Sequence, residues 1–399
     1  MFFPKKIIIQ TKFILPILII IAFFFILIKD KPLMADENQY YPIIEKVTNL
    51  DFDKNILSKT SALPGYSFVI GFLRFSFNIT DVAGTRLITT IFSLLSIIIF
   101  YLIAKEFDIK NAKIKTLQFL FLPILFIYLF LIYTDVFSLF LILLSFYFLV
   151  KENYFLSGSI AFLSLPVRQN NIIWIIFFCI YIFLDKKKYN RNIFPYLPSF
   201  FAIIIFVFLN RGGTIGIVNQ WAQPFAIHLQ NVYFALFLFF FLFLPLNLLN
   251  SSKIIHLLKT NYKIFILLAI FSLVYFFTFR IDHPWNQILL DYFLRNKILD
   301  FSNKSFFNKT VFFLPIIYSF LSLLVIKMKE KNFYSVYFFI FLSLSSLWLI
   351  EPRYYFPAFA FFILFKKEQS KTVEYLTIFI FIIASVYIFL QTINNVFFL

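Results

Sequence analysis

IIIQTKFILPILIIIAFFFILI, residues 7–28, decides the fold class of this chain. About 20 consecutive apolar residues cross a bilayer core of about 30 Å as a helix. Runs of this kind recur along all 399 residues, which are 61% hydrophobic and 14% charged, with a mean hydropathy of +0.88. Within lipid, the backbone polar groups of such a run must be bonded inside the helix itself. The sequence therefore predicts an all-α polytopic membrane protein and excludes a soluble fold.

The first run is predicted to remain in the protein as a membrane span. Lys5 and Lys6 precede it, as in a secretory signal, but the run is too long for the apolar region of one. The following stretch, Leu33-Met34-Ala35, lacks the small-residue pattern of a cleavage site. We expect a retained first helix with the N-terminus on the cytoplasmic side.

The apolar runs predict about thirteen crossings within a single integral-membrane domain, 1–399. The predicted spans are 7–28, 87–104, 117–132, 135–150, 154–166, 171–184, 195–209, 231–249, 264–279, 311–326, 333–350, 354–365 and 373–390. Most Lys and Arg of this chain, whose net charge is +17, fall on one side when the flanks are sorted alternately. That side is cytoplasmic by the positive-inside rule, so the charge reflects topology and no nucleic-acid partner is expected.

The long loops lie on the opposite, external or lumenal, side. They are 29–86, 210–230 and 280–310, whereas every predicted cytoplasmic loop is short. Long loops on a rigid scaffold usually carry function, so we expect the active site on this face. In the first loop, the apolar stretch Tyr66–Phe77 is too short to span and is predicted to form an interfacial helix, with Arg74 reaching the lipid headgroups.

Polar residues gather at the external ends of the spans. The rarest feature is the acidic pair Asp36-Glu37, which follows the first span in a chain with few carboxylates. Taken singly, a charge at a membrane end is an ordinary stop signal or interfacial anchor. Their joint position on the face with the long loops favours a functional site.

One acid with several arginines suits glycosyl transfer from a lipid-phosphate sugar. A carboxylate such as Asp36 can accept the proton of the attacking hydroxyl. The phosphate leaving group needs cations such as Arg168 and Arg353 rather than a general acid. An inverting glycosidase would instead need two carboxylates flanking the bond. This reasoning permits the reaction without selecting it.

Six segments, in order, resemble the motifs of the dolichyl-phosphate-glucose α-1,2-glucosyltransferases, which belong to the GT-C class of membrane glycosyltransferases. They are Asp36-Glu37-Asn38-Gln39-Tyr40-Tyr41-Pro42, Phe52-Asp53-Lys54, Leu63-Pro64-Gly65-Tyr66, Tyr133-Thr134-Asp135-Val136, Arg168-Gln169-Asn170-Asn171-Ile172-Ile173-Trp174 and Glu351-Pro352-Arg353-Tyr354-Tyr355. The resemblance departs at Gln39-Tyr40, where the family usually has an aromatic residue and a histidine. It departs again at Thr60-Ser61-Ala62-Leu63, which differs from the family's Thr-Thr-Pro.

The resemblance implies a GT-C type fold, an inverting hexosyltransferase and Asp36 as its base. The donor would be a polyprenyl (dolichyl) phosphate hexose, with glucose as the expected sugar, and the acceptor a lipid-linked oligosaccharide or a surface glycan, joined by an α-1,2-type linkage. Glu37 is expected to orient the acceptor or assist. Arg168 and Arg353 would hold the donor phosphate, Gln169 and Asn170 would bond sugar hydroxyls, and Tyr354, Asp135 and His283 are further substrate-binding candidates. The membrane would be that of the ER in a eukaryote and the plasma membrane in a bacterium.

One alternative to the transferase stays open. A transporter or flippase for lipid-linked sugars usually has ionisable groups at mid-membrane and helices broken by Gly or Pro. This chain has seven glycines and almost no charge within its apolar runs, which favours the transferase. The three histidines show no metal-ligand spacing, so neither a metal site nor a cofactor is expected.

Overall fold

The structure is a computed structural model that describes residues 5–51, 63–184, 190–209 and 226–399. The motif Phe52-Asp53-Lys54 and most of the predicted external loop 210–230 lie outside these described residues. Within them the regular elements are all helices, accompanied by two isolated bridges, Phe293 with Phe398 and Met328 with Lys366. The predicted all-α class is confirmed for the described part of the chain.

The chain divides into two compact units, which we describe separately. The first unit comprises 1–120 and 125–219, and the second comprises 121–124 and 220–399. The helices from the N-terminus to Leu209 are α1 (Lys5–Ile28), α2 (Glu37–Thr48), α3 (Gly65–Ser76), α4 (Val82–Phe107), α5 (Ala112–Leu120), α6 (Pro123–Phe126), η1 (Ile127–Leu129), α7 (Thr134–Val150), α8 (Tyr154–Ser164), α9 (Asn171–Leu184), η2 (Asn190–Tyr196) and α10 (Leu197–Leu209).

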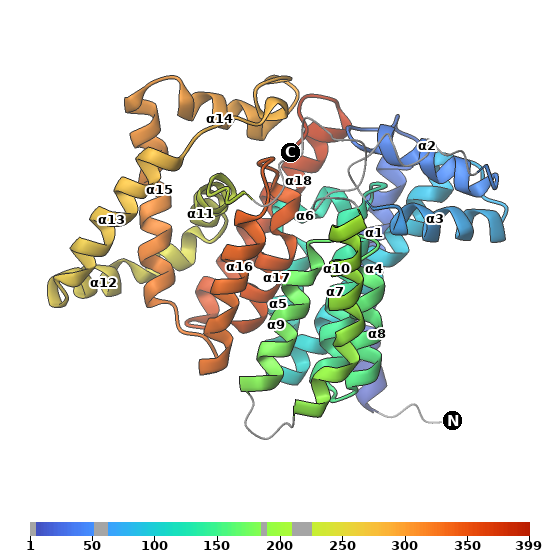
Figure 1. Cartoon of the computed structure of the whole chain (residues 1–399), viewed down its shortest axis with the longest axis horizontal. Helices are drawn as coiled ribbons and strands as arrows, with labels where there is room; N and C mark the ends of the chain where they lie inside the picture. The colour runs from blue at the N-terminus through green and yellow to red at the C-terminus, as the bar shows by residue number, and fades with distance from the viewer. Residues whose placement is uncertain (1–4, 52–62, 185–189, 210–225) are drawn as a thin grey trace. The chain divides into compact units, whose positions relative to one another are not determined.

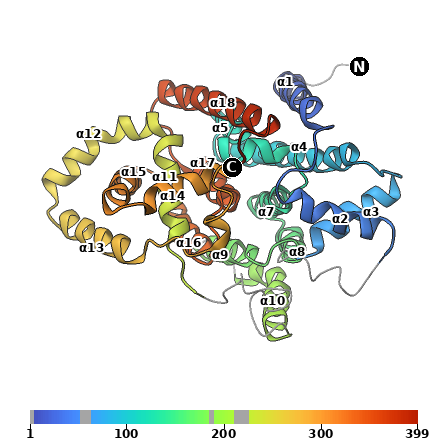
Figure 2. The same ribbon diagram turned by 90° about the horizontal axis from the view of Figure 1, so that it is seen from above.

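In the first unit, α7 is the central helix. It packs against α4 and α8, and 13 of its 17 residues are buried, among them Asp135 and Ser138. The helices α2 and α3 pack side by side and run roughly crosswise to α7 and α8 (Figures 1 and 2). The predicted first external loop thus contains two helices set across the bundle, and their location at a membrane interface stays a prediction.

The second unit begins its helices with α11. They are α11 (Gln230–Leu242), α12 (Leu244–Thr260), α13 (Lys263–Thr278), η3 (Pro284–Asn286), α14 (Leu294–Asn303), α15 (Phe306–Val325), η4 (Lys331–Tyr334), α16 (Ser335–Ser345), η5 (Pro352–Tyr355), α17 (Phe356–Phe365) and α18 (Lys371–Ile393). Here α15 packs against α11, α12 and α14, and α14 runs crosswise to it (Figure 1).

Four described helical segments are long and apolar enough to cross a membrane. They are Val82–Phe107, Asn192–Leu209, Phe306–Val325 and Lys371–Ile393, and the number rises to six if each of two bent helix pairs counts as one span. Five shorter apolar helices of 10–17 residues accompany them. The polytopic character is therefore supported, whereas the number of thirteen crossings stays a prediction.

Two predicted spans are broken rather than continuous. The span predicted at 117–132 consists of Ala112–Leu120 followed by Pro123–Leu129 at an angle of 58°, and that at 231–249 consists of α11 and α12 at 97°. Proline explains both positions, since Pro123 begins α6 and Pro245 stands at the start of α12. Proline has no backbone N–H to donate and its ring clashes with the preceding turn, so a helix stops before it.

Candidate functional site

Asp36 lies in the first unit, between the end of α1 and the start of α2. The preceding residue, Ala35, has a φ of 46°, a left-handed conformation that residues with a Cβ rarely adopt. The backbone N–H of Asp36 donates to the hydroxyl of Tyr133 at 2.9 Å, and Asp36 is half-buried. A strained turn thus places the backbone of Asp36 against the segment that opens α7.

Glu37 has a different environment, in which its carboxylate is fully buried. Its Oε1 accepts from Arg86 Nε at 3.0 Å and from the N–H of Ile132 at 2.9 Å. Its Oε2 accepts from Arg86 Nη2 at 2.5 Å and from the N–H of Met34 at 2.9 Å. With two hydrogen bonds to each oxygen and no exposure, this carboxylate is engaged within the protein. The geometry favours a positioning role over the predicted contact with the acceptor.

Arg168 and Asp135 form another ion pair in the first unit. Arg168 Nη2 lies 2.7 Å from Asp135 Oδ1, and Arg168 Nε donates to the hydroxyl of Thr134 at 3.4 Å. The Asp135 side chain is 2% exposed and that of Arg168 is 21% exposed. Since Asp36 and Arg168 both bond to the run Tyr133-Thr134-Asp135, the structure anchors the predicted base and the predicted phosphate ligand on one segment.

The predicted motif Leu63-Pro64-Gly65-Tyr66 is bound to the loop that precedes Arg168. The N–H of Gly65 donates to the carbonyl of Pro166 at 2.9 Å. A Cβ at position 65 would stand 2.6 Å from that carbonyl oxygen, closer than real Cβ contacts. Only glycine permits this approach. The requirement for glycine at this place explains one motif position by packing.

Tyrosine rings line the interior between these segments. Tyr40 lies edge-on to Tyr66 and Tyr133, with ring centroids 6.1 and 5.9 Å apart. Tyr66 is fully buried, and its burial raises its pKa well above the ordinary value, with Glu37, Tyr40 and Asp135 adding to the rise. The Tyr66 phenol is therefore protonated at any physiological pH, and a neutral hydroxyl can donate a hydrogen bond.

The run Arg168–Trp174 contains half-buried and fully buried residues. Arg168, Gln169 and Asn170 are half-buried in the turn before α9, whereas Asn171 and Trp174 are buried. Asn171 Nδ2 donates to Ser138 Oγ at 2.8 Å and to the carbonyl of Ser164 at 2.9 Å. Asn171 thus fixes the turn to α7 and α8, which leaves the first three residues as the candidates for substrate contact.

The remaining predicted residues, Arg353, Tyr354 and His283, belong to the second unit. Glu351 Oε2 lies 2.8 Å from Arg295 Nη2 and 3.8 Å from Arg353 Nη2, and all three side chains are buried. The Arg353 guanidinium also lies over the Tyr354 ring, 5.6 Å from its centroid. Two arginines around one carboxylate leave this cluster with a net positive charge. Arg295, which sequence reasoning missed, is an integral part of it.

His283 has a structural environment in the same unit. Its Nδ1 accepts from the N–H of Trp285 at 3.1 Å, and its ring lies 4.5 Å from that of Trp348. Trp348 Nε1 in turn donates to Asp282 at 2.9 Å. These contacts hold the predicted external loop 280–310 against the segment that precedes Glu351. These contacts give His283 a local structural role, and its contact with substrate stays a prediction.

Two further observations concern residues outside these clusters. Arg74, predicted to reach the lipid headgroups, is instead buried and donates to the carbonyls of Ile79 at 3.1 Å and Thr80 at 2.8 Å; that prediction is wrong. Its carbonyl partners lie just beyond α3, so the guanidinium binds the segment that follows this helix. Among the described residues no group of three or more His, Cys, Asp or Glu is placed to hold a metal ion.

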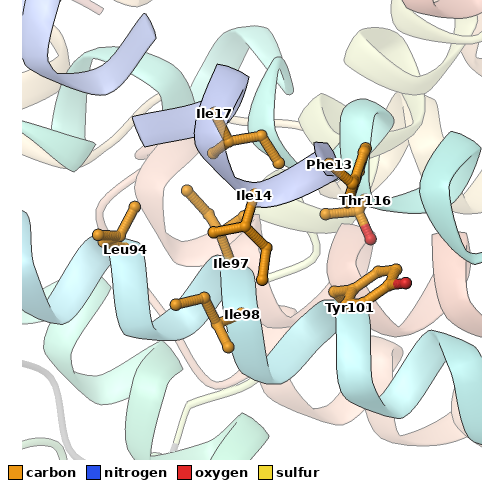
Figure 3. A pocket seen from close by; sticks show the side chains of 8 residues that line it. All are labelled: Phe13, Ile14, Ile17, Leu94, Ile97, Ile98, Tyr101 and Thr116. Atoms are coloured by element: carbon orange, nitrogen blue, oxygen red, sulfur yellow. The ribbon is translucent and has the colours of Figure 1, made fainter. Parts of the chain in front are cut away.

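A small hollow in the first unit is apolar and unsuited to the reaction. It lies between α1, α4 and α5, where Phe13, Ile17, Ile97 and Tyr101 point toward one another (Figure 3). Its lining contains no charged residue. A glycosyl transfer needs a base and a cation, so this hollow is not the candidate active site.

The apolar helices, with half-buried Asp36 and the ion pair Arg168–Asp135 bound to one segment, are consistent with a polytopic helical membrane protein. Residues 58–192 match the sequence model of the DIE2/ALG10 family, whose members are glycosyltransferases of N-glycan precursor assembly. The match covers about a third of the chain and supports a glycosyltransferase related to this family. No curated protein and no solved structure matches the chain.

The matched region contains three of the six predicted motifs. It includes Gly65, Asp135 and Arg168, whereas Asp36 and Arg353 lie outside it. The structure connects Asp36 to this region through Tyr133, and Glu37 to it through Arg86 and Ile132. The predicted base therefore contacts the part of the chain that the family match covers.

Proposed function

We propose that this chain is an inverting glycosyltransferase of the GT-C class that uses a polyprenyl-phosphate hexose, with glucose as the expected sugar. The acceptor would be a lipid-linked oligosaccharide or a surface glycan, and an α-1,2-type linkage would form. The family match over 58–192 supports the donor class. The observation that carries the proposal is the contrast between Asp36, which is half-buried, and Glu37, whose oxygens are both engaged.

The contrast matters because full burial and four hydrogen bonds exclude Glu37 from contact with a substrate, whereas Asp36 is only half-buried. In the proposed reaction the acceptor oxygen attacks the anomeric carbon while the bond from that carbon to the phosphate oxygen breaks. Asp36 accepts the hydroxyl proton, and the polyprenyl phosphate departs as an anion that needs no general acid. A hydrolase acting with inversion would need two carboxylates flanking the bond, and Glu37, whose oxygens are both engaged within the protein, does not supply one of them.

Arg168 is proposed to bind the donor phosphate. Buried Asp135 holds one edge of its guanidinium, and the side chain remains 21% exposed. Arginine offers five N–H donors in a planar fork, so a guanidinium held on one edge can still bond phosphate oxygens with the other. Gln169 and Asn170, half-buried in the same turn, are proposed to bond sugar hydroxyls. Tyr354, Arg353 and His283 stay predictions from the resemblance.

The test is a transfer assay on membranes that contain the full chain. Polyprenyl-phosphate glucose, mannose and arabinose, each radiolabelled, are supplied separately, and products are identified by mass. We expect a glycosylated product with glucose, and a fall of about 10²- to 10⁴-fold with Asp36→Asn. Asp30→Asn is the matched control, because Asp30 lies in the same loop with its side chain 75% exposed and paired to Lys29. Exchange of labelled donor across the membrane with no glycosylated product would identify a transporter instead.

A further inference from the structure

We infer that Arg86 and Glu37 form a positioning clamp that holds the strained turn carrying Asp36, an inference that rests on the proposed function for its catalytic meaning. Arg86 lies in the first turns of α4 and is 0% exposed. The structure gives it a set of acceptors that all belong to the segment 28–37.

The first part of the clamp is the contact between Arg86 and the end of α1. Arg86 Nη1 donates to the carbonyls of Ile28 at 2.8 Å, Lys29 at 3.3 Å and Lys31 at 2.6 Å, and Nη2 donates to that of Pro32 at 2.9 Å. The last carbonyls of a helix have no partner within it and carry the negative end of the helix dipole. A buried guanidinium donates to these carbonyls and offsets the negative end of the dipole with its positive charge. It therefore fixes where the chain leaves α1.

The second part is the carboxylate on the far side of the turn. Arg86 Nε and Nη2 bond both oxygens of Glu37, at 3.0 and 2.5 Å. The Glu37 carboxylate also accepts from the N–H of Met34, within the turn, and from the N–H of Ile132, just before α7. One guanidinium therefore joins the chain before the turn to the chain after it.

The residue enclosed by these bonds is Ala35, at a φ of 46°. A left-handed conformation is unfavourable for alanine and persists only where the surroundings hold it. Asp36 follows directly, and its N–H is bonded to Tyr133. The clamp therefore holds a backbone conformation that alanine would otherwise leave, and this conformation sets the direction of the Asp36 side chain.

Arg86→Lys is the test variant. Lysine keeps the charge and can still pair with Glu37, but one ammonium cannot reach the four carbonyls as well. Misplacement of a catalytic group by about 1 Å costs about 10²-fold in rate. We expect kcat to fall between about ten- and a hundred-fold while KM for polyprenyl-phosphate glucose changes less than about two-fold. An unchanged kcat in the folded variant would overturn the inference.

Two companion variants separate positioning from simple loss of stability. Arg74→Lys is the matched control, because Arg74 is also a buried arginine of the first unit that bonds backbone carbonyls, those of Ile79 and Thr80. It should leave kcat unchanged. Adding Ala35→Gly to Arg86→Lys should restore part of the lost kcat, because glycine adopts positive φ without strain. If the double variant is as slow as Arg86→Lys alone, the clamp does not act through this turn.

A third measurement does not depend on the reaction. Amide hydrogen exchange of the purified full chain reports the order of 29–37 directly. Arg86→Lys should speed exchange in this segment, where the N–H groups of Met34 and Asp36 are bonded, and leave α9 unchanged. Unchanged exchange in 29–37 would overturn the clamp even if transfer is observed. Absence of transfer by the wild-type chain would instead overturn the proposed function, while the exchange result still decides the clamp.

Discussion

Two ion pairs of the first unit, Glu37–Arg86 and Asp135–Arg168, have the same chemistry and different surroundings. Glu37 and Arg86 are both 0% exposed, and the Arg86 guanidinium donates to the Glu37 carboxylate and to four backbone carbonyls. Asp135 is similarly buried, but its partner Arg168 is 21% exposed. The fully buried pair connects parts of the protein interior, whereas the partly exposed Arg168 can contact the proposed donor phosphate only if its exposed part faces the donor. We therefore expect the exposure of the arginine to separate a structural pair from a binding pair.

The largest expected effect is the loss of stability when the fully buried pair Glu37–Arg86 is broken. Glu37→Leu leaves the buried Arg86 charge without a counter-ion, and loss of one partner of a buried pair costs about 3–5 kcal/mol. Unfolding of the purified protein in detergent measures it. Asp135→Leu is the comparison, with a smaller expected loss of about 1–3 kcal/mol, because Arg168 can turn toward water. Equal losses would show that exposure of the arginine does not separate the two pairs.

Loss of Arg168 from the partly exposed pair Asp135–Arg168 should reduce donor use more than it reduces stability. Charge-assisted hydrogen bonds contribute about 1.5–3 kcal/mol, so Arg168→Ala should weaken use of a polyprenyl-phosphate sugar by about ten- to a hundred-fold. Initial rates at several donor concentrations measure this loss. Lys304→Ala, at a side chain that is 65% exposed and paired with Asp300, should leave donor use unchanged. Normal donor use by Arg168→Ala would remove Arg168 from the site.

A smaller effect is expected from the packing beneath the Arg168 loop. Gly65→Ala places a Cβ 2.6 Å from the backbone oxygen of Pro166, and overpacking of this kind costs about 1–3 kcal/mol. Gly84→Ala is the comparison, because its nearest atoms belong to the side chains of Ile79 and Asp81 and not to the backbone. Thermal unfolding of both variants compares them. A Gly65→Ala protein as stable as Gly84→Ala would show that the 63–66 turn does not support this loop.

The smallest effect is expected at Tyr66. Its hydroxyl has no hydrogen-bond partner among the described residues, and its burial keeps the phenol protonated by raising its pKa. Removing a buried polar group without a partner is close to neutral or stabilising, so Tyr66→Phe should change the free energy of unfolding by less than about 1 kcal/mol. Denaturation curves recorded at pH 7 and pH 9 should coincide in this difference. A loss above that size would reveal a partner for the hydroxyl.

The sequence predicted the helices well, because an apolar run long enough for a membrane has few other stable conformations. The predicted segments at 87–104, 135–150 and 373–390 lie within α4, α7 and α18. The bends at 58° and 97° were missed, although Pro123 and Pro245 mark them. Hydropathy alone does not report where a helix changes direction.

The candidate site was predicted in part. Asp36, Asp135 and Arg168 were named, and the structure anchors them on one segment of the first unit. Arg86 was missed because its partners are backbone carbonyls and a carboxylate more than 45 positions away, which no local pattern reveals. Arg74 was misread for a related reason: an arginine at a helix end can bond carbonyls of its own chain instead of lipid. Pairing across the fold therefore decides the role of these charges.

The most direct test of the central claim compares two adjacent carboxylates in one assay. Asp36→Asn and Glu37→Gln are purified, their unfolding is measured, and transfer from polyprenyl-phosphate glucose is followed for the folded fraction. The account predicts that Asp36→Asn unfolds like the wild-type chain and loses about 10²- to 10⁴-fold in turnover, whereas Glu37→Gln loses stability. Wild-type turnover by folded Asp36→Asn would contradict the assignment of Asp36 as the base.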